Sequence, residues 1–338
     1  MKSALIGLGR MGLRHLDNLL ALKLDVVGVS DPFNQARAAA KDKAQLPDNA
    51  LFADSAEMIM QLKPDVLVIA TTAPAHAELT CLAAESGVKA ILCEKPMATS
   101  IAAARRMIDT CKCNGVRLAI NHPMRFMEIY SLPRQMLASA AYGGVASVHV
   151  TAGNFGLAMN ATHYIEMFRY LTDESPATVQ AWFSAETVAN PRGLEFEDRA
   201  GCLRIVTKSG HRLTIDASSD QGHGLRVNYT ARNGQISIDE LSGRLSWTVR
   251  LPEHRSQPST RYGMPSDDGV SQIEPADAIM PSRRVLQALL AGEGYPTGEQ
   301  GLSAVRTLAA AYLSDAENHR IVFLDHESLP EDRVFPWA

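Results

Sequence analysis

The chain has 338 residues, of which 46% are apolar and 21% are charged, and this length and composition suit two globular domains. The formal net charge of −4 argues against nucleic-acid and anionic-membrane partners, because both require a clustered positive field. No apolar run could span a membrane or form a signal-peptide core, and the five cysteines lack zinc-site spacing. We therefore expect a cytoplasmic protein with reduced thiols and no bound metal.

The first third of the sequence alternates apolar, strand-like runs with helical patterns. Residues 3–6 form the first run, which ends at Gly7, and leucines at helical spacing follow it. Further strand-like runs occupy residues 26–29, 66–70, 90–93 and 117–120, and helices are expected around 77–85 and 100–114. Apolar strands that alternate with helices predict a doubly wound parallel sheet that is covered on both faces.

The pattern changes after about residue 122. We expect helices over 132–142 and 161–171, strands over 145–151 and 178–184, and consecutive antiparallel strands between 202 and 250. A long polar loop is expected over 252–275, then a helix over about 298–316 and a strand over 321–324. The chain is therefore predicted to be α/β in residues 1–121 and α+β, with a large, mostly antiparallel open sheet, in residues 122–338. The helix over 298–316 could pack back toward the first domain.

A glycine motif lies between the first strand and the first helix. Its residues are Gly7, Leu8, Gly9, Arg10, Met11 and Gly12. The first glycine permits a tight turn, the second lets a pyrophosphate approach the backbone, and the third lets the helix pack closely on the strand. This position predicts a Rossmann domain that binds a dinucleotide through Gly7, Gly9, Arg10, Met11 and Gly12. A purely structural glycine turn is the alternative.

Asp31 ends the second strand, about 20 residues after the glycine motif, where an acid binds the adenosine ribose hydroxyls. A carboxylate there would repel a 2′-phosphate, so NAD is favoured over NADP. Arg37 lies close enough in the sequence to weaken this discrimination. The alternative is an aspartate that only initiates the turn at Pro32.

Two polar segments follow the third and fourth strands, at the sheet edge that faces the ligand in this class of fold. After the third strand, the candidate cofactor contacts are Thr71, Thr72, Pro74 and His76, although His76 could equally only pack at the start of a helix. After the fourth strand come Glu94, Lys95 and Pro96. A lysine beside a nicotinamide can hydrogen-bond a reacting oxygen, and Glu94 could orient or stabilise its ammonium group. An isolated Glu-Lys pair would more often be solvated surface.

Together these segments resemble the Gfo/Idh/MocA family of oxidoreductases, which includes glucose–fructose oxidoreductase and inositol 2-dehydrogenase. The resemblance continues past the first domain. Residues 121–126 resemble the segment that opens the family's second domain, and residues 302–324 resemble its closing helix and strand. Nearly the whole chain is thus covered. The Glu-Lys-Pro motif and the tail are specific to the family, while the glycine motif is not.

The resemblance implies that Lys95 is the catalytic lysine and that Asn121, with Glu94 and Lys95, lies near the cofactor. It identifies His163 with the family's general acid/base, a role that suits an imidazole with an ordinary pKa of about 6.5. A histidine that only packs at a helix start is the alternative. The candidate substrate-binding residues are His122, Arg125, Asn160 and Tyr164. Arg125 could bind a substrate carboxylate or form a structural ion pair.

The sequence departs from the family pattern around His163. Met159 stands where the family often has aspartate, Ala161 where it often has glycine, and Glu166 where aspartate is usual. Losing the aspartate removes a substrate anchor or a group that orients the histidine. Asn160 could reach the same helical face as His163 and supply a neutral part of that role.

The resulting hypothesis is an oxidoreductase that transfers hydride between NAD, less favourably NADP, and a sugar, cyclitol or sugar derivative. One alternative is a nucleotide-sugar or nonulosonate-pathway dehydrogenase. A second, from another class, is a non-catalytic NAD(P)-sensing regulator of the same fold. We also expect a homodimer or homotetramer that assembles through the sheet of the substrate-binding second domain.

Overall fold

The computed structural model describes residues 1–338 except 154, 189, 276, 278 and 327. The chain divides into two compact units that are each discontinuous in sequence. The first unit contains Met1–Pro123, Ala278–Val305 and Pro330–Ala338, and the second contains Met124–Asp277 and Arg306–Leu329. A single boundary between residues 121 and 122 was predicted, whereas the first unit also contains two later segments. The assignment of cofactor binding and substrate binding to separate parts of the chain stays a prediction.

The first unit is built on a parallel sheet, which confirms the Rossmann prediction. Among the described residues its six strands are β1 (Lys2–Ile6), β2 (Asp25–Ser30), β3 (Leu51–Phe52), β4 (Val66–Ile69), β5 (Ala90–Cys93) and β6 (Arg117–Ile120). The strand order is β3-β2-β1-β4-β5-β6, so the order reverses between β1 and β4, where this fold class binds dinucleotides. The central strands are fully buried, as expected for apolar runs covered on both faces.

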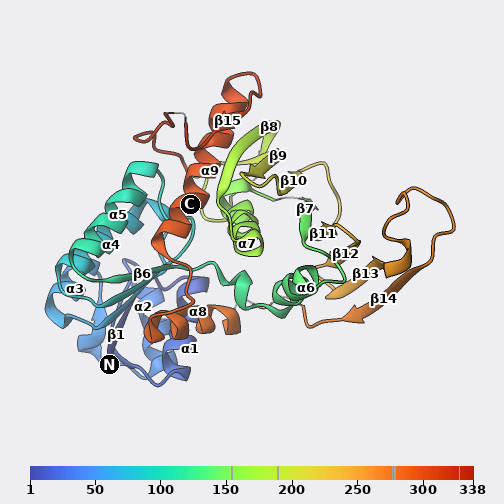
Figure 1. The fold of residues 1–338 in the computed structure, drawn as a ribbon. Coiled ribbons are helices and arrows are strands. Elements are labelled where there is room, and N and C mark those ends of the chain that lie inside the picture. The colour runs from blue at the N-terminus through green and yellow to red at the C-terminus, as the bar shows by residue number, and fades with distance from the viewer. Residues whose placement is uncertain (154, 189, 276, 278, 327) are drawn as a thin grey trace. The chain divides into compact units, whose positions relative to one another are not determined.

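The helices of the first unit form two packed groups, and Figure 1 shows them on the two sides of the sheet. One group is α1 (Arg10–Ala21), α2 (Asn34–Ala44) and α8 (Ile279–Ala291); the other is α3 (Ser55–Leu62), α4 (His76–Glu85) and α5 (Ile101–Cys113). Side-chain caps begin two of them: Asp54 accepts a hydrogen bond from the Glu57 N–H at 2.9 Å, and Ser100 accepts one from the Ala103 N–H at 3.1 Å. Short 3₁₀ turns cover Asp48–Ala50 and Ala73–Ala75.

The last residues of the chain belong to the first unit. The Phe335 N–H donates to the Thr99 carbonyl at 2.8 Å, and the buried rings of Phe335 and Trp337 stack with centroids 4.5 Å apart. Arg105 holds Glu331 through two hydrogen bonds of 3.0 Å. This tail therefore packs on the segment that leads from β5 into α5.

The second unit is built on a large sheet that is mostly antiparallel, as predicted. Its nine strands among the described residues are β7 (Val145–Gly153), β8 (Pro176–Val188), β9 (Asp198–Thr207), β10 (Arg212–Ser218), β11 (Arg226–Ala231), β12 (Gly234–Asp239), β13 (Arg244–Arg250), β14 (Ser266–Gln272) and β15 (Val322–Phe323). Their order is β14-β13-β12-β11-β7-β10-β9-β8-β15, and β7 and β10 pair in parallel. One face is apolar and buried, and the other is polar and more exposed.

Two helical segments of the second unit matter for the site: α6 (Glu128–Ala138) and α7 (Thr162–Thr172). A wide π turn, Leu157–Ala161, leads into α7, and 3₁₀ turns cover Pro123–Phe126 and Pro252–His254. The helix α9 (Gly298–Ala316) starts in the first unit and ends in the second. Among the described residues, no helix is both long and apolar enough to cross a bilayer.

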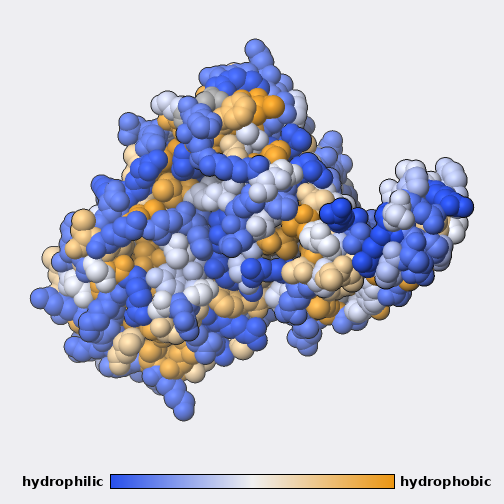
Figure 2. Space-filling model, in the orientation of Figure 1, coloured by the Kyte–Doolittle hydropathy of each residue, from blue (hydrophilic) through white to orange (hydrophobic). Residues whose placement is uncertain are grey.

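Two expectations for the second unit were wrong. The helix expected over 132–142 begins and ends earlier, since Glu128 supplies an acid in its first turn and Pro133 is accommodated inside it. The loop expected over 252–275 contains the edge strand β14, whose residues are mostly polar and exposed and so carry no apolar alternation. The β13–β14 hairpin projects from the sheet in Figure 1, and its end is mainly hydrophilic in Figure 2.

Candidate active site

The glycine motif forms the turn between β1 and α1. Gly7 has a φ of +84°, which favours glycine, and a Cβ at Gly12 would lie 1.9 Å from the Gly7 carbonyl oxygen. A Cβ at Gly9 would meet no atom within 4 Å, so this glycine borders open space. Because α1 has no acidic residue in its first turn and Gly9 provides no side-chain cap, its first N–H groups can bind a pyrophosphate.

Asp31 is fixed at the end of β2. Its Oδ2 accepts a hydrogen bond from the Leu8 N–H at 2.8 Å, and its Oδ1 accepts one from the Phe33 N–H at 2.9 Å. Each carboxylate oxygen keeps a lone pair for a ribose hydroxyl. Arg37 donates to the carbonyls of Asp31 and Pro32 at 2.6 and 3.0 Å, so this guanidinium is tied to the backbone of the same loop.

The loop after β4 is braced by His76. Its Nδ1 lies 3.0 Å from the Pro96 carbonyl oxygen and its Nε2 lies 3.2 Å from the Thr71 carbonyl oxygen. Burial lowers the pKa of His76, which favours the neutral ring. A neutral ring can donate to only one of these two carbonyl oxygens, and the buried ring packs between this loop and the Glu94-Lys95-Pro96 turn. Thr72 accepts the turn's first backbone bond, Pro74 is exposed, and the buried Thr71 hydroxyl has no hydrogen-bond partner among the described residues.

Glu94 is buried at the end of β5 and holds three groups. Its Oε1 accepts hydrogen bonds from His15 Nε2 at 2.7 Å and Asn121 Nδ2 at 2.8 Å, and its Oε2 accepts one from the Lys95 N–H at 3.3 Å. Burial alone would raise the pKa of Glu94, but the His15 hydrogen bond, the charges of His15 and Lys95 and the Asn121 hydrogen bond hold that pKa well below its usual range. Glu94 is therefore a carboxylate.

Lys95 and Asn121 differ in how the structure presents them. Lys95 is half-buried, whereas the other residues from Ala90 to Ser100 are buried. Asn121 is buried, and its Nδ2 also lies 3.2 Å from the Ser282 hydroxyl. The Asn121 Oδ1 is buried without a hydrogen-bond partner among the described residues, and such an atom is a place where a bound ligand can donate. His122 is buried, and its N–H donates to the Ile120 carbonyl at 2.7 Å.

In the second unit, the π turn and the start of α7 present Met159, Asn160 and His163. These three side chains are half-buried, whereas the residues around them from Phe155 to Phe168 are buried. Wide helical turns of this type are frequent at functional sites. The turn brings the predicted residues Asn160 and His163 to the same side of the helix.

Asp198 holds this turn and was not anticipated from the sequence. Its carboxylate accepts hydrogen bonds from the Ala158 N–H at 2.8 Å and the Met159 N–H at 2.9 Å. A Cβ at Gly156 would lie 2.0 Å from Asp198 Oδ2, so the close approach requires glycine. Asp198 stands on β9, far away in the sequence, and no local pattern links it to the turn.

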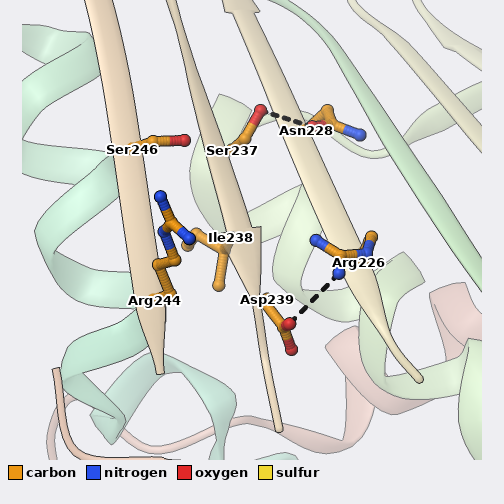
Figure 3. A pocket seen from close by; sticks show the side chains of 7 residues that line it. All are labelled: Arg226, Asn228, Ser237, Ile238, Asp239, Arg244 and Ser246. Atoms are coloured by element: carbon orange, nitrogen blue, oxygen red, sulfur yellow. Dashed lines mark hydrogen bonds and ion pairs between the residues drawn. The ribbon is translucent and has the colours of Figure 1, made fainter. Parts of the chain in front are cut away.

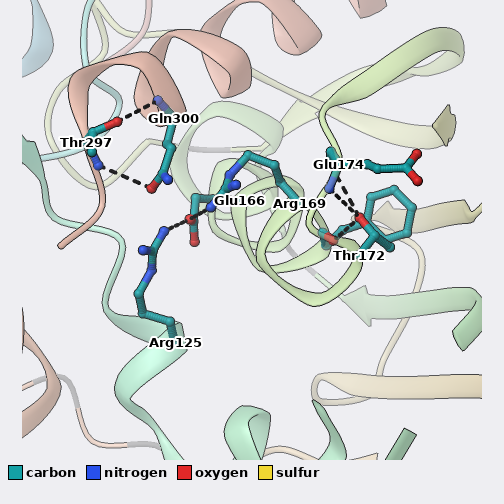
Figure 4. A network of polar contacts seen from close by, with 8 residues as sticks. Arg125, Glu166, Arg169, Thr172, Glu174, Thr297 and Gln300 are labelled. Carbon is teal, nitrogen blue, oxygen red and sulfur yellow. Dashed lines mark hydrogen bonds and ion pairs between the residues drawn. The ribbon is translucent and has the colours of Figure 1, made fainter. Parts of the chain in front are cut away.

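Arg125 takes part in a buried ion-pair cluster, shown in Figure 4. Glu166 Oε1 accepts hydrogen bonds from Nη2 of Arg125 and from Nη2 of Arg169, the latter at 3.2 Å. The Arg125 guanidinium also lies 4.9 Å from the centre of the Tyr170 ring. The structural ion pair considered for Arg125 is thus present, and contact with a substrate carboxylate stays a prediction.

Tyr164 is directed into the second unit. Its hydroxyl donates to Glu240 Oε2 at 2.5 Å and lies 3.5 Å from the Tyr130 hydroxyl. Burial and the Glu240 carboxylate raise the pKa of Tyr164, so it stays a phenol. This geometry gives the hydroxyl a structural partner, and its contact with substrate stays a prediction. No cluster of metal-ligating side chains occurs among the described residues.

Comparison with known proteins agrees with this geometry. Residues 1–122 match the model of the Gfo/Idh/MocA oxidoreductase family, described as an NAD-binding Rossmann fold. This family match covers the parallel sheet and the glycine turn, and the curated relatives extend the similarity beyond residue 122. The chain is 27% identical over 353 residues to D-apiose dehydrogenase of Paraburkholderia graminis, covering 95% of this chain and 89% of the relative.

A second curated relative and a solved structure are also similar to this chain. Inositol 2-dehydrogenase of Mycolicibacterium smegmatis is 26% identical over 254 residues, covering 70% of this chain and 72% of that protein. The solved structure of an Agrobacterium radiobacter oxidoreductase with NAD⁺, L-tartaric acid and magnesium superimposes with a TM-score of 0.79 at 19% identity, covering 96% of this chain and 98% of that one. This structural likeness shows the shared fold. The matched family is NAD-binding, which agrees with the cofactor that the glycine motif predicts.

Proposed function

We propose that this oxidoreductase is an NAD-dependent dehydrogenase of a hydroxyl group on a sugar, a cyclitol or a sugar derivative. The relatives named D-apiose dehydrogenase and inositol 2-dehydrogenase support this substrate class. The observation that carries the proposal is the packed Glu94-Lys95-Pro96 turn at the carboxyl edge of the sheet, in which Lys95 is half-buried and its neighbours are buried. The regulator alternative is less favoured because the named relatives are dehydrogenases.

In this proposal, NAD, when bound, supplies the hydride-accepting nicotinamide. The glycine turn and the start of α1 hold its pyrophosphate, Asp31 binds the adenosine ribose and excludes a 2′-phosphate, and the Thr71 hydroxyl and Asn121 amide supply polar contacts. The free lone pairs of Asp31 and the unmatched oxygens of Thr71 and Asn121 support this assignment.

In this proposal, Lys95 and His163 act on the reacting hydroxyl group and its proton. Lys95 hydrogen-bonds the reacting oxygen and stabilises its developing negative charge. His163 takes the hydroxyl proton as a general base and returns it in the reverse reaction. Asn160 contacts a neighbouring hydroxyl of the substrate. The backbone N–H groups of Ala158 and Met159 donate to Asp198 and so hold the turn that carries Asn160 and leads into the helix of His163.

Substitution of Lys95 tests the mechanism. Lys95→Ala should lower kcat by about a thousandfold, within the usual range for a group that handles the reacting proton, while NAD affinity changes little. Lys89→Ala is the matched control, because Lys89 is an exposed lysine of the same unit that pairs with Asp65. Wild-type turnover by Lys95→Ala on the true substrate would refute this mechanism.

A substrate panel tests the function itself. The purified protein should reduce NAD with at least one polyol or aldose. A response confined to nucleotide sugars would favour the nucleotide-sugar alternative. A protein that binds NAD but responds to no member of the panel would favour the regulator alternative.

We further propose that the protein acts in the cytoplasm as a homodimer or homotetramer and that its polar sheet face meets a second copy. This face bears a shallow cavity of about 210 Å³ whose lining is shown in Figure 3. Arg226, Asp239 and Arg244 form one row across β11, β12 and β13, and Asp216 is exposed on the same face at β10. Arg226 pairs with Asp239 at 3.2 Å within the chain, so a two-fold interface would bring Arg244 of one copy toward Asp216 of the other.

Light scattering tests the assembly. We expect the double variant Arg226→Glu/Arg244→Glu to dissociate into monomers at concentrations at which the wild type is dimeric or tetrameric. A wild-type protein that is strictly monomeric would exclude this interface.

A further inference from the structure

A hydrogen-bonded network of four buried polar side chains lies at the carboxyl edge of the first sheet. His15 comes from α1, Glu94 from the end of β5, Asn121 from the end of β6 and Ser282 from α8. None of the four is more than 4% exposed. Glu94 is the centre of this network, because its Oε1 accepts hydrogen bonds from both His15 and Asn121.

The hydrogen-bond donors and acceptors of this network determine the orientation of the Asn121 amide. An ionised carboxylate can only accept hydrogen bonds, so His15 Nε2 and Asn121 Nδ2 must both donate to Glu94. The amide nitrogen of Asn121 is thereby fixed toward Glu94 and Ser282, and Oδ1 must face away from them. This carbonyl oxygen is the buried acceptor that has no partner among the described residues. A buried acceptor left unmatched costs about 1–3 kcal/mol, so a ligand that donates to it gains affinity.

We infer that His15, acting through Glu94, orients Asn121 so that its Oδ1 accepts a hydrogen bond from the carboxamide NH₂ group of the nicotinamide. His15 is thus a positioning residue for cofactor recognition. The inference rests on the proposed placement of the nicotinamide at the ends of β5 and β6, beyond the point where the strand order reverses. It is independent of the substrate that the enzyme oxidises.

The role of His15 follows from what its loss would do. Without His15, the Glu94 carboxylate keeps Asn121 and the Lys95 N–H as its partners and loses its shortest hydrogen bond. A buried carboxylate with fewer partners can rotate or take up water. Asn121 then has no reason to keep its nitrogen toward Glu94, and the defined acceptor for the carboxamide is lost.

The experiment compares two cofactors that differ at the proposed hydrogen bond. In 3-acetylpyridine adenine dinucleotide a methyl group replaces the carboxamide NH₂, so it cannot donate to Asn121. Isothermal titration of the wild type should show NAD binding about tenfold more tightly than this analogue, the size expected for one buried hydrogen bond. The ratio of the two dissociation constants is the readout, and it needs no substrate.

In His15→Ala this ratio should fall toward one, and in His15→Gln, whose amide can still donate to Glu94, it should recover in part. Asn18→Ala is the matched control. Asn18 is buried one turn further along α1 and bonds to Ile279 and Arg283 on α8 rather than to Glu94. Asn18→Ala should lower the melting temperature and leave the ratio unchanged.

An unchanged ratio in His15→Ala, with both affinities lowered equally, would overturn the positioning role and leave only a structural one. If His15→Ala does not fold, Glu94→Gln tests the same network. The glutamine amide can present either a donor or an acceptor to Asn121, so the ratio of the two dissociation constants should also fall. Asn121→Ala tests the placement of the nicotinamide. A full ratio in that variant would show that the nicotinamide lies elsewhere, whatever the outcome for the sugar dehydrogenase proposal.

Discussion

The candidate residues of the two units are held in different ways. In the first unit, Glu94, Asn121, His15 and His76 are buried and fixed by side-chain hydrogen bonds among the ends of several strands and helices. In the second unit, Asn160 on the wide turn and His163 at the start of α7 are half-buried, and one carboxylate, Asp198, holds the turn through its backbone. The candidate cofactor residues are therefore preorganised, whereas the candidate substrate residues can be exchanged without disturbing their support.

The largest expected effect on cofactor affinity concerns the two glycines of the turn between β1 and α1. Gly9→Ala should leave the melting temperature unchanged, because a Cβ there meets no protein atom within 4 Å, yet block the close approach of the pyrophosphate. We expect NAD affinity to fall by about a hundredfold. Gly12→Ala is the comparison, since its Cβ would overlap the Gly7 carbonyl and should lower both stability and affinity. Equal stability losses in the two variants would contradict this assignment.

The second prediction concerns the support in the second unit. Asp198→Ala removes the acceptor of two backbone N–H groups, so His163 and Asn160 should lose their fixed position. We expect kcat to fall by about tenfold to a hundredfold, the range in which loss of an orienting group acts. NAD affinity should not change, and titration calorimetry on the same sample checks this. A loss of NAD affinity would show that the two regions are not supported independently.

The third prediction concerns the choice of cofactor. Asp31→Ser removes the carboxylate that repels a 2′-phosphate while keeping a hydroxyl for the backbone N–H groups of the loop. NADP affinity should rise by about tenfold relative to NAD affinity, measured by the ratio of the two dissociation constants. Asp25→Ser is the control, because Asp25 is an exposed aspartate at the start of the same strand. An unchanged ratio in Asp31→Ser would place the adenosine ribose elsewhere.

The smallest expected effect is a pH dependence of stability. The pKa of His76 in the folded protein is lowered by burial, so the unfolded chain binds more protons than the folded chain near the ordinary histidine pKa of about 6.5. Stability should therefore be complete above that pH and decrease as the pH falls below it. Melting temperatures of the wild type and of His76→Gln, measured from pH 7.5 down to about 5, should converge in acid. Parallel curves would exclude His76 as the source.

Sequence patterns predicted the first unit well because its strands are apolar runs and its candidate ligand residues directly follow the ends of those strands. The glycine turn, Asp31 and the Glu94-Lys95-Pro96 turn all fall where the parallel sheet places them. The supporting residues were less accessible to this reasoning. His15 follows Gly12 on α1 and would have been noticed only by asking which side of α1 faces the sheet.

In the second unit, local patterns are weaker for a physical reason. Asp198 acts on a turn that is distant in the sequence, so no spacing rule connects the two. The edge strand β14 is polar on both faces because it borders solvent. Met159 replaces the aspartate that is frequent in the family, and it is the backbone N–H of Met159, not its side chain, that Asp198 holds. Long-range contacts of this kind are decided by packing and not by local sequence.

The late segments of the first unit bear on how the protein is made. The Thr297 backbone bridges to Ala119 on β6, and the tail from Pro330 packs near the start of α5. During synthesis, β6 therefore emerges long before the residues that cover its open edge, and an uncovered edge strand is prone to pair with other chains. The unit that begins the sequence is therefore completed only after residues 278–305 and 330–338 have been synthesised, and until then the edge of β6 is exposed.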